Sequence, residues 1–217
     1  QLARSEWQNM LSRLSSSELE ALAEWSLRQD WPQLAIAAAS KAEAWDRLNL
    51  RFPLLYQETF RRYAKQHGLK ANELLAIARR ESALNPGAKS SVGARGLMQL
   101  MPATAKQVAK ANGLGRITVE RLHDVNTNVA LGSAYYRELL ENFGNNRIFA
   151  IASYNAGPGR IRKWREGKLD AAAWVEAIPF KETRQYVQAV MTYNVIYARL
   201  QDQQISLLTE QERNARY

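Results

Sequence analysis

Apolar and polar residues alternate along residues 71–86 with the period of a helix that buries one face. The positions i, i+3, i+4 and i+7 of that face are occupied by Leu74, Ile77, Ala78 and Glu81. The neighbouring charged residues lie off this stripe: Glu73, Arg79 and Arg80. The pattern predicts a helix that turns Glu81 toward the core, in the last turn before Asn85 and Pro86 end it.

An inward-facing Glu81 has two interpretations that periodicity does not distinguish. Burial disfavours the ionised form of a carboxyl group and raises its pKa. A general acid that works near neutral pH needs such a raised pKa. The other interpretation is a buried glutamate that is paired with an arginine elsewhere in the core.

The rest of the chain also has helical periodicity, and no strand pattern is longer than four residues. We expect further helices at about 17–29, from 32 onward, and at about 53–66, 102–111, 126–143, 147–153, 171–178 and 182–200. Ser17 and Thr209 each begin a stretch with capping-box spacing, although the final ten residues could equally be a frayed tail. The predicted fold class is therefore mainly α.

The sequence Arg51-Phe52-Pro53 predicts a boundary between a helical segment, residues 1–52, and a larger domain, residues 53–217. The first segment contains four tryptophans: Trp7, Trp25, Trp31 and Trp45. We expect these large side chains to anchor the packing of helices rather than to bind a ligand.

Two breaks in the helical pattern could hold a ligand. Residues 87–102 contain three glycines, two serines and two methionines, and a glycine-rich loop lets the backbone approach a ligand closely. The loop lacks the Gly-Lys-Ser/Thr ending of a phosphate-binding P-loop. Gln99 with Met98 and Met101 would suit a glycan, although the methionines would equally suit the core. The second break displays Tyr154 and Asn155 where a helix stops.

Composition restricts the class of partner but does not identify it. The 217 residues carry 30 Lys and Arg against 21 Asp and Glu, a net charge of +9. A basic surface suits nucleic acid, an anionic membrane surface or an acidic cell-wall polymer. The cations are scattered along the chain, whereas a nucleic-acid-binding helix would cluster them with interleaved aromatic residues. No apolar run approaches the roughly 18 residues of a membrane span.

The available chemistry is limited to carboxylates. The chain has no cysteine, and its two histidines, His67 and His123, lack the spacing of a catalytic triad or a zinc helix. We therefore expect no metal site. Ordinary glycosidases use two carboxyl groups, and Glu182 is a conceivable second one. It begins a helix, where a carboxylate also complements the helix dipole.

Four short motifs occur in a fixed order: Arg80-Glu81-Ser82, Gly96–Pro102, Tyr154–Gly159, and Ile178–Thr183 followed by Tyr186-Val187. Together they resemble the motif set of the soluble lytic transglycosylases, over about residues 53–197. The segment before Pro53 resembles the linker and last superhelical turns that precede the catalytic domain in large members of that family. The resemblance implies a goose-lysozyme-like, mainly α domain.

The resemblance also implies an activity. The family cleaves the β-1,4 bond between N-acetylmuramic acid and N-acetylglucosamine and leaves a 1,6-anhydro ring. Glu81 would first protonate the glycosidic oxygen and would then take the proton of the muramic 6-hydroxyl. The residues implied to line the glycan groove are Ser90, Gln99, Met101, Tyr154 and Glu182, with Ser82 beside the catalytic carboxyl and with Asn155 and Tyr193 as further candidates.

By the same resemblance we expect a periplasmic protein of the Gram-negative envelope that acts on peptidoglycan glycan strands as a monomer and needs no cofactor. The chain lacks an initiating Met and a signal-peptide pattern at Gln1, so we expect a mature or excised piece. The alternative on the same scaffold is a muramidase or chitinase-type hydrolase, with a carboxylate-activated water opposite Glu81. A glycan-binding module with an inactive site is another alternative, although Glu81 argues against it.

Overall fold

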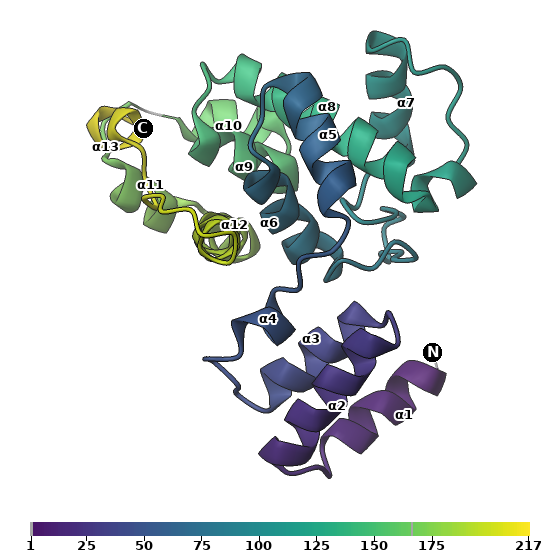
Figure 1. Ribbon diagram of the computed structural model, residues 1–217. Helices are drawn as coiled ribbons and strands as arrows, with labels where there is room; N and C mark the ends of the chain where they lie inside the picture. The colour runs from purple at the N-terminus through teal and green to yellow at the C-terminus, as the bar shows by residue number, and fades with distance from the viewer. Residues whose placement is uncertain (1, 166) are drawn as a thin grey trace.

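Regular structure in this protein is helical (Figure 1). The computed structural model describes residues 2–165 and 167–217. The elements are, in chain order, α1 (Leu2–Leu11), α2 (Ser16–Arg28), α3 (Pro32–Lys41), α4 (Leu48–Arg51), α5 (Gln57–His67), α6 (Ala71–Ser82), α7 (Pro102–Ala111), the 3-10 helix η1 (Glu120–His123), α8 (Val125–Asn142), α9 (Arg147–Ala156), α10 (Pro158–Trp164), α11 (Ala171–Ala177), α12 (Lys181–Arg199) and α13 (Glu210–Asn214). Within the described residues, β-pairing is limited to isolated bridges between positions 89 and 100. The prediction of a mainly α fold is confirmed.

Helices α1 to α4 form a group of their own beneath the remaining helices (Figure 1). The capping box that starts α2 is present, but its residues are Ser15 and Glu18 rather than Ser17 and Glu20. Glu20 instead pairs with Arg47, which also contacts Glu24. Glu20, which the spacing predicts to be part of a helix cap, therefore joins α2 to Arg47 at the start of α4.

The prediction that the first four tryptophans anchor helix packing is wrong for three of them. Trp25, Trp31 and Trp45 are 41%, 44% and 61% exposed. The contact between α2 and α3 is made through small residues, because these helices bury Ala23, Ala35, Ala38 and Ala39 completely. Alanine lets two helices approach closely, and this leaves no space for an indole ring. Trp25 and Trp31 instead meet edge to face at the surface, with their ring centroids 5.4 Å apart.

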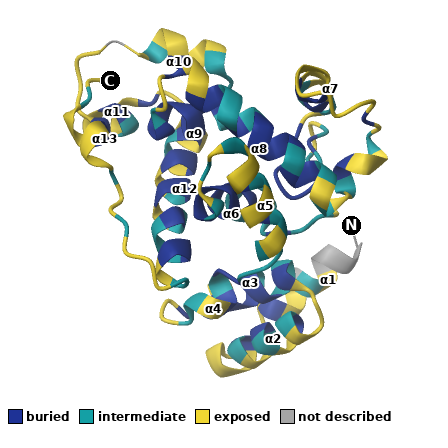
Figure 2. Cartoon of the chain, turned by 45° about the horizontal axis from the view of Figure 1, so that its top comes forward, coloured by how far each residue is buried: buried dark blue, intermediate teal, exposed yellow. Residues whose placement is uncertain are grey.

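Helix α6 lies at the centre of the helices from α5 onward and packs against α5 and α12. Figure 2 shows the buried residues gathered on α6, α8, α9 and α12. The predicted stripe of Leu74, Ile77 and Ala78 is fully buried. However, residues 72–78 are all buried, so α6 is enclosed on every side rather than on one face. Its other polar residues need partners inside the protein.

Helix α6 ends at Ser82, before the predicted stop at Asn85 and Pro86. Ala83 and Leu84 both adopt left-handed backbone conformations, with φ of 51° and 62°. Such a conformation is unfavourable for residues with a β-carbon. Leu84 is completely buried in the main core, and this burial offsets the backbone strain. The contact that ends the helix is therefore tertiary, and the proline downstream is not needed to explain it.

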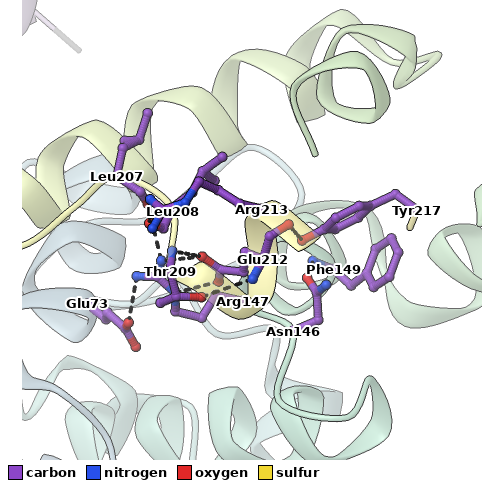
Figure 3. Close-up of polar contacts among 10 residues, drawn as sticks. All are labelled: Glu73, Asn146, Arg147, Phe149, Leu207, Leu208, Thr209, Glu212, Arg213 and Tyr217. Atoms are coloured by element: carbon purple, nitrogen blue, oxygen red, sulfur yellow. Dashed lines mark hydrogen bonds and ion pairs between the residues drawn. The ribbon is translucent and has the colours of Figure 1, made fainter. Parts of the chain in front are cut away.

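The glutamate of α6 that pairs with a buried arginine is Glu73 and not Glu81 (Figure 3). Arg147 at the start of α9 donates from Nη1 to Glu73 at 3.1 Å, and from Nε and Nη2 to the two carboxylate oxygens of Glu212, each at 2.6 Å. Glu73 and Glu212 are 5% and 3% exposed. This charge cluster, Glu73, Arg147 and Glu212, ties α6, α9 and α13 together. The sequence had placed Glu73 off the buried stripe, which is wrong.

The last ten residues are an ordered part of the domain. Thr209 and Glu212 form the predicted capping box at the start of α13. Tyr217 is completely buried; its carbonyl accepts the backbone amides of Lys168 and Leu169, and its amide donates to Leu169. Its ring packs against Phe149 and Trp174. Of the two alternatives for this segment, a capped helix is correct and a frayed tail is wrong.

None of the helices within residues 2–165 and 167–217 combines the length and hydropathy that a membrane-crossing helix requires.

Candidate active site

Glu81 lies in the last turn of α6, facing α12. Its Oε1 accepts a hydrogen bond of 2.6 Å from the hydroxyl of Tyr186, a buried residue of α12. Burial raises the pKa of Glu81 to about 7, and the nearby charge of Glu182 acts in the same direction. The Tyr186 hydrogen bond and the charge of Arg80 lower that pKa and offset part of the effect. Glu81 is therefore a carboxyl group that can change protonation near neutral pH.

The glycine-rich loop is attached to the helices around Glu81 by polar side chains. Ser82 Oγ donates to the carbonyl of Leu97 at 2.8 Å, and the hydroxyl of Tyr154 donates to the carbonyl of Met98 at 2.9 Å. Ser82 and Tyr154 are both predicted glycan contacts. In the protein alone, their hydroxyl groups hold the loop in place, which brings it alongside α6 and α9.

Asn128 organises the same loop from inside α8 and was missed by the sequence analysis. It is completely buried. Its Oδ1 accepts the amide of Met98 at 2.8 Å, and its Nδ2 donates to the carbonyls of Arg95 and Leu122 at 3.0 and 2.8 Å. The only sequence signal for this role was a polar residue, Asn128, next to apolar residues near the start of a long predicted helix. Its loop partners lie about 30 positions away, so sequence could not have shown them.

Gly96 has no space for a side chain because Asn128 and the backbone press against it. A β-carbon there would lie 2.1 Å from the carbonyl oxygen of Leu122 and 2.3 Å from Asn128 Nδ2, and the residue has φ of +75°. We expect Gly96→Ala to lower the free energy of unfolding by about 2–4 kcal/mol, from left-handed strain plus overpacking. Chemical denaturation would measure this change.

Gly93→Ala is the matched control for Gly96→Ala. Gly93 also has positive φ, of +98°, but a β-carbon there would meet only a side-chain nitrogen of Arg95 at 4.0 Å. Its replacement should therefore cost the strain alone, about 1–2 kcal/mol. Equal losses for the two variants would contradict the close approach at Gly96.

The remaining predicted residues of the loop differ in their surroundings. Gln99 has φ of +46°, and its Nε2 donates to the carbonyls of Gly96 and Ala88 at 2.9 and 3.3 Å. Ser90 Oγ accepts the amide of Ala94 at 2.9 Å. Met98 is completely buried whereas Met101 is 40% exposed. The core interpretation is therefore correct for Met98, and Met101 is free at the surface where the loop enters α7.

Asn155 and Glu182 are joined in a small polar network at the end of α9 and the start of α12. Thr183 Oγ1 donates to Asn155 Oδ1 at 2.7 Å, and Asn155 Nδ2 donates to Glu182 Oε1 at 3.4 Å. Glu182 is exposed. Its charge nevertheless acts on Glu81, so this network borders the candidate site.

Tyr193 belongs to a different set of contacts. Its ring lies 4.9 Å from that of Phe52 and 5.4 Å from the guanidinium of Arg79. The structure therefore connects Tyr193 to the end of the first segment rather than to the hydrogen bond of Glu81. Tyr186, which makes that hydrogen bond, lies in one of the four sequence motifs but is not among the predicted site residues. Its place among the buried, mainly apolar residues of α12 concealed its polar role.

A hollow of about 400 Å³ beside α7 contains none of these residues; Lys106, Lys110 and Arg116 are among those lining it. None of the residues that line this hollow carries a carboxyl group, so the candidate site is identified by its chemistry and not by cavity size.

Comparison with protein families gives three matches. The Transglycosylase SLT domain matches residues 58–176, which is more than half of the chain. The Soluble lytic murein transglycosylase L domain matches residues 1–48, and the Soluble lytic transglycosylase helical domain matches residues 177–205.

Individual relatives agree with these matches. The soluble lytic murein transglycosylases of Salmonella typhimurium and Escherichia coli K12 are 43% and 42% identical to 99% of this chain. The chain spans about a third, 34%, of the length of each of these relatives.

Two solved structures have the same fold. One is the 70 kDa soluble lytic transglycosylase Slt70 of Escherichia coli, with a TM-score of 0.93, 42% identity, and coverage of 99% of this chain and 35% of that one. The other is an inactive mutant of lytic transglycosylase Slt of Pseudomonas aeruginosa, with a glutamate changed to glutamine; its TM-score is 0.92, at 40% identity over 97% of this chain and 35% of that one. The motifs, the helical fold and these matches together show that the chain belongs to the Transglycosylase SLT domain family.

Proposed function

We propose that this chain is a peptidoglycan lytic transglycosylase that cleaves the β-1,4 bond between N-acetylmuramic acid and N-acetylglucosamine. The single observation that carries the proposal is the raised pKa of the Glu81 carboxyl group. This one carboxyl group has a pKa of about 7 and is hydrogen-bonded to Tyr186 beside the glycine-rich loop.

In the first step, protonated Glu81 donates its proton to the glycosidic oxygen. A pKa near the working pH gives a carboxyl group that is both protonated often enough and acidic enough to act. Tyr186 fixes the direction of the carboxyl group. Tyr186 stays a neutral hydrogen-bond donor, because burial raises the pKa of its hydroxyl well above the ordinary value.

In the second step, the Glu81 carboxylate takes the proton of the muramic 6-hydroxyl as that oxygen closes on the anomeric carbon. The bond to N-acetylglucosamine breaks, and a 1,6-anhydro ring forms without addition of water. The nucleophile is part of the substrate, so its attack is intramolecular and is favoured entropically. One side chain then serves as acid and base, and the scheme requires no cofactor.

The names of relatives support the same reaction class. They are soluble lytic murein transglycosylases, and one solved structure is a complex of such an enzyme with bulgecin A. The names of these relatives also agree with our proposal that the substrate is the glycan strand of peptidoglycan. We further propose a periplasmic location in a Gram-negative envelope, action as a monomer, and a division at Phe52 between residues 1–52 and the catalytic domain.

The alternative is hydrolysis on the same scaffold. Glu182 is the candidate for the second carboxylate that hydrolysis would need, since its charge acts on Glu81. Mass spectrometry of muropeptides released from purified peptidoglycan separates the two reactions. Products that lack one water relative to a reducing sugar support the transglycosylase. Products with reducing ends would instead identify a hydrolase.

We expect activity to fall as pH rises through about 7. The protonated form of Glu81 starts the reaction, and its pKa is raised to about 7. At one pH unit above that value only about a tenth of the sites are protonated. Tyr154 and Tyr186 stay neutral over this range, since burial raises the pKa of each. Initial rates of muropeptide release across the pH range would measure the profile.

Tyr186→Phe tests whether the pH profile reports the pKa of Glu81, because it should shift the profile in a known direction. The Tyr186 hydrogen bond lowers the pKa of Glu81, so its loss should move the midpoint of the profile to higher pH. A wild-type rate that stays flat from about pH 5 to beyond about pH 9, with an unchanged rate-limiting step, would count against Glu81 as the acid.

A further inference from the structure

We propose that the hollow of about 400 Å³ formed by α7 and residues 115–119, here called the α7 hollow, is a binding site for a phosphate group. The inference goes beyond the proposed function, because none of the residues expected to contact glycan lines this hollow. Figures 1 and 2 both show α7 at the edge of the molecule, apart from α12. A ligand in the α7 hollow would therefore use a different set of residues from the glycan.

Three cations from two segments line the α7 hollow: Lys106 and Lys110 of α7, and Arg116 of the loop that follows it. The two lysines are four positions apart, so they lie on the same face of α7, where like charges repel. None of the other lining residues is acidic, and Glu120, the next acid along the chain, is not among them. The hollow thus has no carboxylate of its own to balance these charges.

The three cations also lack partners elsewhere in the protein. The ion pairs within residues 2–165 and 167–217 involve other cations: Arg47, Arg137 and Arg147. Over the same ranges, the side chains of Lys106, Lys110 and Arg116 make no hydrogen bond and no ring contact. One unpaired cation is ordinary at a protein surface. Three of them around one hollow produce a concentrated positive potential that attracts an anion.

Backbone N–H groups add further donors to the α7 hollow. In the loop after α7, the amides of Gly113 and Leu114 donate back to the carbonyls of Lys110 and Ala109. The amides of residues 115–119, by contrast, have no acceptor among the described residues. All five of these residues line the hollow. An unpaired N–H group needs an acceptor from water or from a ligand.

A buried side chain holds this loop against α7. Ile117 is 6% exposed and belongs to the same small core as Ala105, Val108 and Ala109 of α7. Its burial fixes the neighbouring Arg116 beside the helix that carries the two lysines. The donors of the α7 hollow are therefore arranged by the fold before a ligand binds, which reduces the entropic cost of binding.

The kind of donors in the α7 hollow favours a phosphate group. Lysine ammonium groups and consecutive backbone N–H groups are common donors to phosphate, and Arg116 can give two parallel hydrogen bonds to two of its oxygens. A phosphate monoester carries about two negative charges and three strong acceptor oxygens, so it can use donors from both segments. Neutral sugar hydroxyl groups do not need this concentration of charge. A phospholipid head group and a soluble phosphate ester offer the same chemistry.

Isothermal titration calorimetry of the whole chain with pyrophosphate at low salt tests this site, with malonate as the dicarboxylate for comparison. The variant Lys106→Gln with Arg116→Gln removes one lysine and one arginine from the α7 hollow. The matched control, Lys65→Gln with Arg62→Gln, removes the same charges from α5. All four side chains are exposed, so both variants should fold, and circular dichroism would check this.

We expect Lys106→Gln with Arg116→Gln to weaken pyrophosphate binding at least about tenfold, as for the loss of charge-assisted contacts. The α5 control should change the affinity less than about twofold, because salt screens distant surface charges. The wild-type chain should bind malonate more weakly than pyrophosphate. The proposal is wrong if pyrophosphate does not bind, if both variants weaken its binding equally, or if malonate binds as tightly.

Vesicles distinguish the two sources of the phosphate group. The wild-type chain and both variants would be sedimented with vesicles that contain phosphatidylglycerol, and with vesicles of phosphatidylcholine alone. If the wild type and the α5 control sediment with phosphatidylglycerol and the hollow variant does not, the ligand is a lipid head group. If pyrophosphate binding depends on the α7 hollow but sedimentation does not, the ligand is a soluble phosphate ester.

Discussion

Glu81→Gln should lower the turnover of peptidoglycan about a thousandfold, within the range typical of losing a general acid and base. The amide cannot donate a proton to the glycosidic oxygen, nor can it accept one from the 6-hydroxyl. Its oxygen can still accept the hydrogen bond from Tyr186, so the shape of the site is retained. Muropeptide release, followed by chromatography and mass spectrometry, would give the ratio of rates.

A fold control accompanies this variant. The native state raises the pKa of Glu81 from 4.5 to about 7, so its carboxylate form is unfavourable in the folded protein. This energetic cost is absent below about pH 4.5 and grows as pH rises toward 7. Removal of the charge should therefore leave the Tm at pH 8 equal to or above that of the wild type. A marked fall in Tm would mean that lost activity reports unfolding.

Glu182→Gln distinguishes the proposed reaction from hydrolysis. Glu182 is exposed and is joined to Asn155, so in our scheme it contacts glycan and takes no part in proton transfer. Its replacement should reduce activity far less than Glu81→Gln does. An equal loss, together with reducing-end products from the wild type, would make it the second carboxylate of a hydrolase.

Arg147→Met should lower the free energy of unfolding by about 3–5 kcal/mol, the range for breaking a buried ion pair from one side. Methionine has a similar length but leaves Glu73 and Glu212 buried without their cation. Burial raises the pKa of Glu73, which has a single contact with Arg147. Burial opposes ionisation of Glu212 as well, but hydrogen bonds from Arg147 and Thr209 outweigh it and lower the pKa of that group.

The matched control is Arg137→Met, which breaks an ion pair with Glu141 one helical turn away. The side chains of that pair are 31% and 61% exposed, and we expect a loss of less than about 0.5 kcal/mol. Chemical denaturation would measure both variants. The triple variant Glu73→Gln, Arg147→Met and Glu212→Gln should be more stable than Arg147→Met alone, because it leaves no unpaired charge. Similar losses for Arg147→Met and Arg137→Met would contradict a buried charge cluster.

Several elements could be predicted because their causes are local. Helix α7 was expected at 102–111 and has these bounds, since Pro102 is suited to a first helical position and Asn112 and Gly113 stop the helix. Asp170 and Asn146 cap α11 and α9, which were expected as helices at about 171–178 and 147–153. Helix α5 was expected from Pro53 but begins at Gln57, because residues 53–56 instead continue the connection from the first segment.

The sequence by itself determined the helical class and the order of the helices, but it left Glu81 with two interpretations, a general acid or the buried partner of an arginine. Helical periodicity and capping depend on residues within a few positions of each other, so they can be read along the chain. Only the tertiary structure decided which glutamate of α6 pairs with an arginine and which one meets Tyr186. These contacts join residues 74 and 105 positions apart, and α6 is enclosed on all sides, so no local pattern distinguishes Glu73 from Glu81. The same holds for Arg79 and Arg80: the first packs against Phe52 and Tyr193, whereas the second lies over the ring of Tyr186 beside the site.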